Sequence, residues 1–580
     1  MSSIIRIFPL LFKKLPFTTL FLFINYLIDA ARPAVIAVIS IRLFEGIADT
    51  LNPDVYFNTN NLYIYAALFV GVMLLGDFIE NISSIPQGWF YDKGSIIMKS
   101  IIFDKSAKLS LLKYEDDNVL DMKERAISSV DDNAPQLFFI EGVLMGRFIL
   151  IIVGLAAVLA TYNIWLLPLS VLTVLPYLYV RIVRGTEMYS IRRFQAKRGR
   201  FLNYLWELLS TSSPAKEIRT MGFGGYISEK WMNLRDEINE EHWAHNKKES
   251  ISMLICDIIR LIGYGVSIAV VVVLVINGDL SVAVLGVALT AFLVMQENFR
   301  EFFSAVGNVS ENIGFVKDFF EFIDLPEKKY GDRNFPGLTN NITAKNITFS
   351  YPNQEENALQ SVDFTINKGE TIAVVGENGS GKTTLVKLLL GLYETDSGEV
   401  MYDGVPVKSL SESYLKHISI VSQDFVRYHL PLKECVALSS LDDLNNENKL
   451  RQTIQSAGLN FTNLNEELGR EFGGLELSGG EWQKLAIARG MFKDSEIIVL
   501  DEPTAALDPL IESEILSMFI NAAKSRTTII VSHRVGICRF VDKIVVMDGG
   551  RIVEVGSHDE LMKKDGTYSK LFTSQAQWYQ

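Results

Sequence analysis

Residues 371–389 read TIAVVGENGSGKTTLVKLL, and this stretch decides the fold of the C-terminal half of the chain. The β-branched run at its start predicts a buried strand, and the residues after the glycines predict a helix. Between them, GENGSGKT (376–383) fits the P-loop pattern, in which backbone N–H groups close around phosphate. Lys382 can reach the β- and γ-phosphate oxygens, and Thr383 can ligate Mg²⁺. The stretch therefore predicts an α/β site for a phosphate chain.

A second predicted strand ends in two carboxylates. The run IIVL (497–500) has the composition of a buried strand, and Asp501 and Glu502 follow it. Beside a P-loop, Asp501 can organise Mg²⁺ and Glu502 can accept a proton from attacking water. The alternative is an acidic pair that opens a turn before Pro503, which we would favour if the P-loop were missing.

A third segment, LSGGE (477–481), lies between the P-loop and the acidic pair. A glycine-rich motif of five residues is weak evidence for a phosphate site by itself. Its position between a P-loop and an acidic pair makes the assignment specific. A serine and two glycines that open a helix predict a second phosphate cradle, formed by Ser478, Gly479 and Gly480.

The N-terminal half consists of long apolar stretches. Of the 580 residues, 48% are hydrophobic and 21% charged, and the mean hydropathy is +0.19, which excludes a disordered chain. The net charge of −13 argues against a nucleic-acid partner, and three cysteines without a CxxC pair argue against a disulfide scaffold or zinc ribbon. Since a span needs roughly 20 mostly apolar residues, we predict six transmembrane helices, near 16–43, 62–85, 137–160, 164–183, 251–276 and 281–303.

The charges of the connecting loops predict the orientation of these spans. Residues 93–125 hold seven Lys or Arg and residues 181–248 hold thirteen, whereas residues 46–61 hold none. Basic loops stay on the cytoplasmic side, so we predict a multi-pass membrane protein with both termini in the cytoplasm. No small-residue cleavage site follows the first apolar run, which therefore reads as a retained helix and not as a signal peptide.

The P-loop, LSGGE and the strand that ends in Asp501-Glu502 together resemble the nucleotide-binding domain of ABC transporters. Six spans followed by this domain look like a type IV (ABC-B type) exporter half-transporter. The resemblance implies a multi-domain fold, in which an all-α polytopic membrane domain precedes an α/β P-loop ABC nucleotide-binding domain. We expect these domains at 1–325 and 341–580, with a linker at 326–340. The resemblance also implies ATP hydrolysis coupled to transport, with ATP and Mg²⁺ bound.

Further family residues can be placed on matching motifs. Tyr351 in FSYP matches the aromatic that stacks on adenine, with strand packing as the alternative. Gln423 in VSQDF matches the glutamine that touches Mg²⁺ and water, with a solvated loop amide as the alternative. Asp508 in ALD matches the aspartate that communicates across the dimer, and His533 in VSHR matches the switch histidine at the γ-phosphate, with a structural histidine as the alternative.

The resemblance implies a role for each candidate in the ATP site. Glu502 is expected as the general base, with Lys382 and His533 as the other catalytic groups. The expected metal ligands are Thr383, Gln423 and Asp501. The expected ATP-binding residues are Tyr351, Gly376, Asn378, Gly379, Ser380, Gly381, Lys382, Thr383, Thr384, Gln423, Ser478, Gly479, Gly480, Asp501 and Asp508.

One chain does not complete such a site, because in this family the signature of one domain closes over ATP on the P-loop of another. A single P-loop and a single signature imply a homodimer, with a heterodimer as the alternative. Three segments depart from the commonest pattern: Glu481 replaces a glutamine, Pro503-Thr504-Ala505 replaces the usual exporter Ala-Thr-Ser, and residues 470–474 do not reproduce the usual exporter loop. Residues 112–116 and 216–225 are candidates for the turns that contact nucleotide-binding domains, with a solvated helical hairpin as the alternative.

The substrate is suggested by a resemblance to exporters of lanthionine peptides. The shared-looking stretches are SQDFVRYHLPLKE (422–434), residues 477–509 and the KEIR segment (216–219). The resemblance implies export of a modified, antimicrobial-type peptide across the cytoplasmic membrane of a bacterium, with a peptide-modification enzyme complex as a further partner. Few residues precede the first span, so we expect export without proteolytic leader removal. The alternatives are a multidrug or lipid flippase, or an ATP-gated channel or regulatory subunit.

Charges within the predicted spans are the remaining hints about the substrate, because they are costly in lipid. Asp29 and Arg32 share one helix face, either beside a cavity or in a packing salt bridge. The other charged positions leave an excess of carboxylates that would suit a cationic peptide; they are Asp77, Glu80, Glu141, Glu297, Arg300 and Glu301. The alternative places most of these side chains in the headgroup layer or the cytoplasm.

Overall fold

The computed structural model describes residues 5–51, 59–160, 168, 171–277, 282–352, 354, 356–502 and 526–576. The chain separates into two compact units, each of which is described by itself. Unit 1 comprises Met1–Lys108 and Asn118–Pro326, and unit 2 comprises Leu109–Asp117 and Glu327–Gln580. Residues 327–340, which we predict as a linker, therefore group with unit 2.

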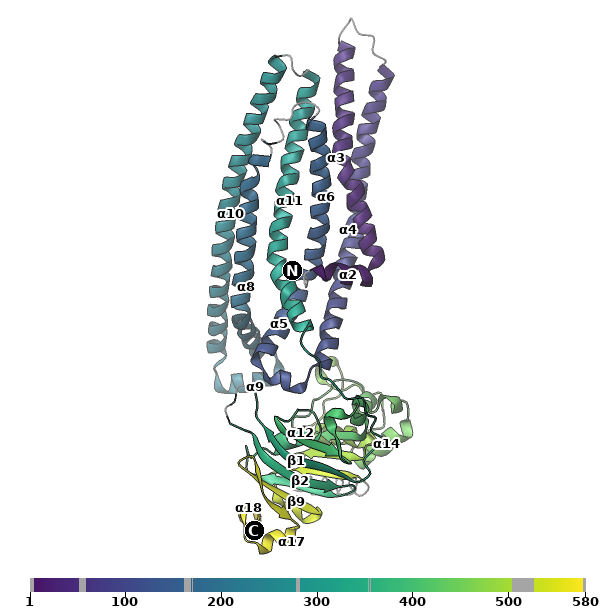
Figure 1. Ribbon diagram of the computed structural model, residues 1–580, viewed down its shortest axis with the longest axis vertical. Coiled ribbons are helices and arrows are strands. Elements are labelled where there is room, and N and C mark those ends of the chain that lie inside the picture. Colours follow the sequence, from purple (N-terminus) through teal and green to yellow (C-terminus); the bar gives the residue numbers. More distant parts are fainter. Residues whose placement is uncertain are drawn as a thin grey trace. The chain divides into compact units, whose positions relative to one another are not determined.

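Unit 1 is helical, and its long helices run side by side (Figure 1). They are α3 (Pro16–Leu51), α4 (Thr59–Lys108), α6 (Ala134–Ala160), α8 (Leu175–Ser210), α10 (Gly224–Ile276) and α11 (Val282–Ile323). The shorter helices are α2 (Ile7–Lys14), α5 (Asp117–Asp131) and α9 (Ser212–Met221). The predicted second contact turn, 216–225, falls on α9 and the start of α10, where Gly222 ends α9 in the left-handed conformation (φ +74°).

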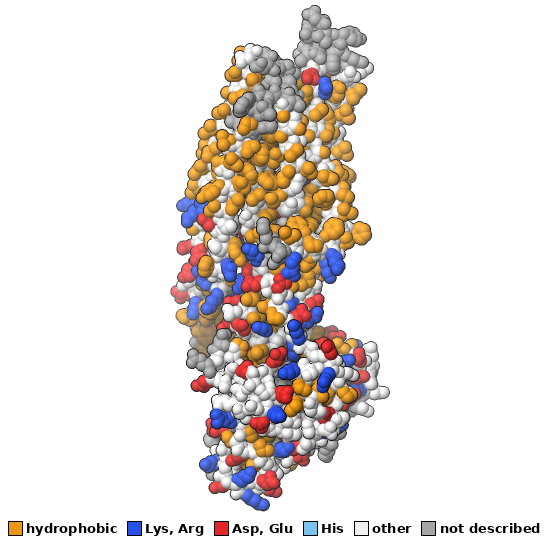
Figure 2. Space-filling view, viewed as in Figure 1, with side chains coloured by type: hydrophobic (Ala, Val, Ile, Leu, Met, Phe, Trp, Pro, Cys, Tyr) orange, Lys and Arg blue, Asp and Glu red, His pale blue; other side chains and the backbone are white. Residues whose placement is uncertain are grey.

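Four helices in the described part of the chain are long and apolar enough to cross a membrane: Pro16–Ile47, Asn60–Lys108, Ala134–Val158 and Gly224–Ile276. The spans predicted near 164–183 and 281–303 overlap α8 and α11, and they stay predictions because each includes residues outside the described ranges. Figure 2 shows hydrophobic side chains over the upper part of the long helices and charged side chains over their lower part. This apolar surface is the pattern expected of helices that face lipid.

The long helices pack through small residues and apolar side chains. α11 contacts α3, α6, α8 and α10. A Cβ atom on Gly185 of α8 would lie 2.7 Å from the backbone oxygen of Gly307 on α11, so only glycine permits this close approach. A buried cluster that includes Ala30, Leu155 and Met295 fills the space between helices further along the bundle.

Unit 2 contains two sheets. The antiparallel sheet has the order β2-β1-β4-β5, formed by β1 (Asn341–Phe349), β2 (Leu359–Asn367), β4 (Ser397–Tyr402) and β5 (Val405–Pro406). The larger sheet has the order β10-β9-β3-β8-β7-β6, formed by β3 (Thr371–Gly376), β6 (Ile418–Val421), β7 (Ile497–Asp501), β8 (Thr527–Val531), β9 (Lys543–Asp548) and β10 (Arg551–Gly556). All its neighbouring pairs are parallel except β9 and β10. The carboxyl ends of β3, β6, β7 and β8 therefore share one edge of the sheet.

Helices complete unit 2. They are α12 (Lys382–Leu389), α13 (Leu432–Ala437), α14 (Glu447–Ser456), α15 (Gly479–Phe492), α17 (His558–Lys563) and α18 (Thr567–Ala576). The 3₁₀ turns are η1 (Leu111–Glu115), η2 (Val407–Ser409), η3 (Glu412–His417), η4 (Leu441–Asp443), η5 (Arg470–Phe472) and η6 (Val535–Phe540). One buried cluster lies between the two sheets and α12, and a second one surrounds Trp482 between α13, α14 and α15.

The predicted first contact turn, 112–116, forms η1 and belongs to unit 2. Leu112 packs against the main core of this unit, and the hydroxyl of Tyr393 donates a hydrogen bond to Glu115 Oε1 at 2.6 Å. The Lys387 ammonium lies 3.7 Å from the same oxygen. An apolar anchor and two polar contacts thus hold this turn, which connects α4 to α5.

Candidate functional site

The P-loop follows β3 and curls around its own lysine. Gly379 (φ +82°) and Gly381 (φ +96°) adopt left-handed backbone conformations, which favour glycine. Lys382 Nζ donates hydrogen bonds to the backbone oxygens of Gly376 at 3.0 Å and Glu377 at 2.9 Å. Burial lowers the pKa of this ammonium, while Glu502 and Asp501 act in the opposite direction. The loop therefore holds a cation at its centre, close to the two carboxylates that follow β7.

Asp501 ends β7 and is buried beside the P-loop. Burial, and then the charge of Glu502, raise the pKa of its carboxyl, while a hydrogen bond from Thr383 lowers it. Its Oδ1 atom is buried and has no hydrogen-bond partner among the described residues. A buried carboxylate oxygen without a donor, next to a hydroxyl, is the arrangement that a magnesium ion would complete. The exposed Gln423 lies just after β6. It lines a cleft together with Lys382 and Thr383, and it adds an amide oxygen there.

Glu502 and His533 face each other from the ends of neighbouring strands. Glu502 has a left-handed backbone (φ +46°), and its N–H donates to the backbone oxygen of Val531 at 2.9 Å. Its Oε2 lies 3.1 Å from Nδ1 of His533. A non-glycine residue in this conformation is strained, and such strain concentrates at functional sites. The carboxylate is thereby turned toward the cleft, with an imidazole beside it.

Tyr351 closes one side of the cleft. Its hydroxyl shares a hydrogen bond of 3.0 Å with Thr384 Oγ1 on α12. Its ring meets the rings of Phe349 and Tyr393 edge to face, with centroids 5.2 and 6.0 Å away. The side chain therefore has packing partners and also lines the cleft, so strand packing and a face for a flat ring coexist at this residue.

These residues line one cleft of about 830 Å³ at the shared edge of the larger sheet. The cleft brings together ten predicted residues: Tyr351, Asn378, Gly379, Gly381, Lys382, Thr383, Thr384, Gln423, Glu502 and His533. Gly376, Ser380 and Asp501 lie directly beside them in the P-loop and at the end of β7. Asp508 lies outside the described residues.

Part of this cleft is formed by residues that the sequence motifs do not predict. Its further lining residues are Gln354, Glu356, Asn357, Ala358, Gln360, Gly549 and Gly550. The Gly550 N–H donates to the backbone oxygen of Ser380 at 3.2 Å, and a Cβ at Gly550 would lie 2.8 Å from the backbone oxygen of Ala358. A Gly-Gly pair between two strand patterns predicts the turn, but no local signal shows that this turn supports the P-loop.

The LSGGE segment opens α15 away from the cleft. Ser478 caps the helix: its Oγ accepts from the N–H of Glu481, and the Glu481 carboxylate accepts from the N–H of Ser478 at 2.8 Å. The glutamate that departs from the family pattern thus closes a capping box. Ser478 and Gly479 are exposed, and among the described residues neither these two nor Gly480 line the cleft of Lys382.

The charged residues predicted within the spans are largely paired. Asp29 contacts Arg32 at 3.1 Å and also Arg147 on α6. Glu297 contacts Arg260 at 2.8 Å and also Arg300. Asp29 and Arg32 therefore form a packing salt bridge, because both take part in an ion-pair cluster between helices. Glu141 accepts a hydrogen bond from Asn308 at 2.8 Å.

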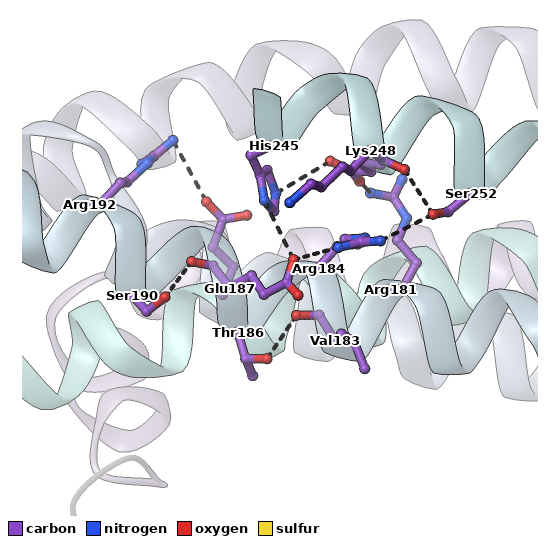
Figure 3. A network of polar contacts seen from close by, with 12 residues as sticks. Arg181, Val183, Arg184, Thr186, Glu187, Ser190, Arg192, His245, Lys248 and Ser252 are labelled. Atoms are coloured by element: carbon purple, nitrogen blue, oxygen red, sulfur yellow. Dashed lines mark hydrogen bonds and ion pairs between the residues drawn. The ribbon is translucent and has the colours of Figure 1, made fainter. Parts of the chain in front are cut away.

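Further along the bundle, a network of polar contacts joins α8 to α10 (Figure 3). Arg181 of α8 contacts Glu249 of α10 at 2.7 Å, and Arg184 contacts Glu187 within α8 at 2.6 Å. Buried His245 lies between them, 3.8 Å from Glu187 and 4.0 Å from Glu249. These polar contacts hold two helices together where the apolar surface gives way to a charged one.

The chain matches known proteins along most of its length. A family model described as "ABC transporter" matches residues 359–505. The chain is 28% identical to the subtilin transport ATP-binding protein SpaT of Bacillus subtilis, over 87% of this chain and 84% of that protein. It is 28% identical to the nisin transport ATP-binding protein NisT of Lactococcus lactis subsp. lactis, over 94% and 92%. It is 27% identical to the ATP-dependent lipid A-core flippase of Pasteurella multocida, over 95% and 93%.

A solved structure shows the same fold. The structure of a bacterial Atm1-family ABC exporter with ATP bound superimposes with a TM-score of 0.78 at 21% identity, covering 95% of this chain and 98% of that chain. In this chain, apolar helices precede the α/β domain that the family model matches. The chain is therefore an ABC exporter homologue with the Atm1-type fold, whose C-terminal unit is an ABC transporter ATPase domain that couples ATP hydrolysis to transport.

Proposed function

We propose that the chain exports a ribosomally made, modified peptide of the antimicrobial type across the cytoplasmic membrane of a bacterium. The observation that carries this proposal is the similarity to the subtilin and nisin transporters, which extends over 87% and 94% of the chain and so includes the helical unit. The helical unit is the part that a substrate would meet.

The charge of the helical unit supports a cationic substrate. Asp77 and Glu80 are exposed on α4, and within the described part of the chain no ion pair involves either of them. Carboxylates at membrane depth are costly unless something pairs with them. A cationic peptide would supply the missing positive charge, whereas a purely apolar substrate would not.

The residues that line the cleft of unit 2 support binding of Mg·ATP and hydrolysis of its terminal phosphoanhydride bond. The P-loop amides and Lys382 would bind the phosphates, and Tyr351 would stack on the adenine. Thr383, Gln423 and Asp501 would hold the metal, as the unpartnered oxygen of Asp501 indicates. Glu502 would accept a proton from the attacking water, and His533 would hold this carboxylate and contact the γ-phosphate.

A homodimer completes the proposed site. Ser478 and Gly479 are exposed at the start of α15, where the N–H groups of a helix attract anions. A second chain could present these groups to the phosphates bound at Lys382, and two-fold symmetry would then create two equal sites. Closure around two Mg·ATP would turn the spans outward, and hydrolysis would reset them. In this arrangement both termini face the cytoplasm.

The experiment that tests the substrate class is an ATPase titration of the purified dimer in lipid nanodiscs. Precursors of nisin and subtilin, with and without leader, serve as peptide probes, and lipid A and a panel of hydrophobic drugs serve as rivals. Glu502→Gln gives the background rate. We expect saturable stimulation by peptide only; stimulation by lipid A or drugs with peptides inert would overturn the peptide substrate and leave the ATP chemistry standing.

A lipid flippase is the second candidate. The similarity to the lipid A-core flippase of Pasteurella multocida covers 95% of the chain, as much as the similarity to the peptide transporters does. The exposed apolar side chains of the long helices would also admit a lipid tail. The titration above separates the two candidates, and a steady ionic current in a bilayer would indicate a channel.

A further inference from the structure

We propose that Gln575 is a positioning residue for ATP hydrolysis, because its amide holds the backbone that directly follows the His533 side chain. Its Nε2 donates a hydrogen bond to the backbone oxygen of His533 at 2.6 Å. Its Oε1 accepts a hydrogen bond from the N–H of Val535 at 2.9 Å. The inference rests on the proposed roles of His533 and Glu502, and it adds a residue that lies outside the nucleotide cleft.

The helix that carries Gln575 is firmly anchored. Tyr568, Phe572 and Gln575 lie at i, i+4 and i+7 of α18 and therefore share one face. Tyr568 is fully buried and Phe572 nearly so, in a cluster with Val535, Ile537 and Cys538 of η6. The hydroxyl of Tyr568 also meets His558 Nδ1 at 2.7 Å. The same face thus packs on η6 and reaches the residues just before it.

Hydrogen bonds within unit 2 also hold the start of the loop that Gln575 contacts, where the Ser532 N–H donates to the backbone oxygen of Val374 at 3.2 Å. Ser532 Oγ accepts from the N–H of Arg534 at 2.9 Å, which fixes the start of the turn. The His533 side chain is 42% exposed, and its Nδ1 lies 3.1 Å from Oε2 of Glu502. A carboxamide is suited to this place, because it offers one donor and one acceptor to a carbonyl and an N–H two residues apart. A carboxylate would lack the donor.

The chemical consequence follows from the geometry at Glu502. This residue has a strained backbone, and its Oε2 is 3.1 Å from the His533 ring. A loop that moves by an ångström would break that contact and leave the carboxylate without its neighbour. Catalysis depends on such positioning far more than binding does. Loss of the Gln575 amide should therefore lower the turnover number and leave nucleotide affinity unchanged.

The test compares Gln575→Ala and Gln575→Glu with the neighbouring exposed control Ser574→Ala in the full-length dimer. We expect both Gln575 variants to lower kcat for ATP by about tenfold with KM within about twofold, and the control to match the wild type. Hydrogen exchange at Val535 should quicken in Gln575→Ala, which removes the acceptor of its N–H, while α18 stays protected. Gln575→Glu keeps the size of the side chain, so it still tests the donor bond if Gln575→Ala folds poorly.

A double-mutant cycle decides whether Gln575 acts through the histidine. On a His533→Ala background, Gln575→Ala should cause no further loss, because the group that it positions is gone. Full additivity, or wild-type kcat in Gln575→Glu, would overturn the proposal. If His533→Ala itself keeps wild-type turnover, then the proposed role of His533 fails together with this inference. If His533→Ala loses turnover but the Gln575 variants keep it, the role of His533 stands and only the proposal for Gln575 fails.

Discussion

The hydroxyl of Tyr393 donates to Glu115 at 2.6 Å and so joins two segments that lie 278 residues apart in the chain. Burial raises the pKa of this tyrosine, and the bond to Glu115 raises it further, so the hydroxyl keeps its proton as a donor. The Tyr393 ring also meets the Tyr351 ring, with centroids 6.0 Å apart. Tyr351, the residue expected beside adenine, is therefore linked through Tyr393 to η1, the turn between α4 and α5.

We predict that Tyr393→Phe weakens the coupling of transport to hydrolysis. The substitution keeps the ring, which stacks on Phe349 with centroids 5.6 Å apart, and removes the hydroxyl, which donates to Glu115 and accepts from Lys387 Nζ at 2.9 Å. Basal ATPase activity should stay within about twofold, while stimulation by the best ligand of the wild type falls by half or more, since one hydrogen bond contributes about 1 kcal/mol. Tyr330→Phe is the control. Equal stimulation in Tyr393→Phe and the wild type would contradict the prediction.

Glu502→Gln should abolish turnover and preserve ATP binding. The amide keeps the shape of the side chain but cannot accept the proton of the attacking water, and a lost general base costs roughly 10²–10⁴-fold in rate. Steady-state ATPase activity and binding of a fluorescent ATP analogue measure the two quantities. Glu447→Gln, on the surface of α14, controls for a general effect of removing a carboxylate. Turnover within about twofold of the wild type would exclude Glu502 as the base.

The shared site predicts complementation between two inactive chains. Lys382→Ala removes the P-loop cation, and Ser478→Ala removes the cap that opens α15. Co-expression of the two variants leaves one intact site in each mixed dimer only if a site takes its P-loop from one chain and its signature from the other. ATPase activity should therefore return in purified mixed dimers. Mixed dimers as inactive as either parent would argue for sites built within single chains.

Asp403 offers a stability prediction with a defined pH dependence. Burial acts to raise the pKa of this carboxylate. Hydrogen bonds from the N–H groups of Thr339, Asn340 and Asn341 outweigh burial, so the pKa is lowered. Its contribution to stability is therefore present above the unfolded pKa of about 3.9 and is lost as pH falls toward the lower folded value.

The corresponding experiment is thermal unfolding of Asp403→Asn at two pH values. At pH 7 we expect a Tm lower by about 2–4 °C, and this difference should shrink below pH 4. Glu399→Gln on the adjacent strand β4 is the control, since no hydrogen bond or ion pair of its carboxylate is seen among the described residues. A Tm difference that is constant with pH would show that the charge of Asp403 is not the cause.

The ATP cleft could be predicted from sequence because its main residues lie in short motifs at the ends of buried strands. The P-loop after β3 and Asp501-Glu502 after β7 meet at one edge, as parallel strands require. Other parts of the site depend on contacts between distant segments. Nothing near Gln575 indicates that it reaches His533, and nothing near Gly550 indicates that it supports Ser380.

In the helical unit too, local features could be predicted from the sequence and contacts between distant segments could not. Apolar length predicts helices, and four of them meet the criteria for a span in the described residues. The pairing of charges was harder to predict: the i, i+3 spacing suggests the contact of Asp29 with Arg32, but Arg147 reaches Asp29 from another helix. Such a partner depends on which helices become neighbours, and the periodicity of one helix does not show it.

Peptide uptake into inside-out proteoliposomes tests the central claim most directly. The purified dimer is reconstituted, a fluorescent cationic lanthionine peptide is added outside, and its accumulation is followed with ATP, without ATP, and with Glu502→Gln. We predict ATP-dependent accumulation by the wild type and none by the variant. ATP-dependent movement of a fluorescent lipid A analogue, with no accumulation of peptide, would contradict the claim.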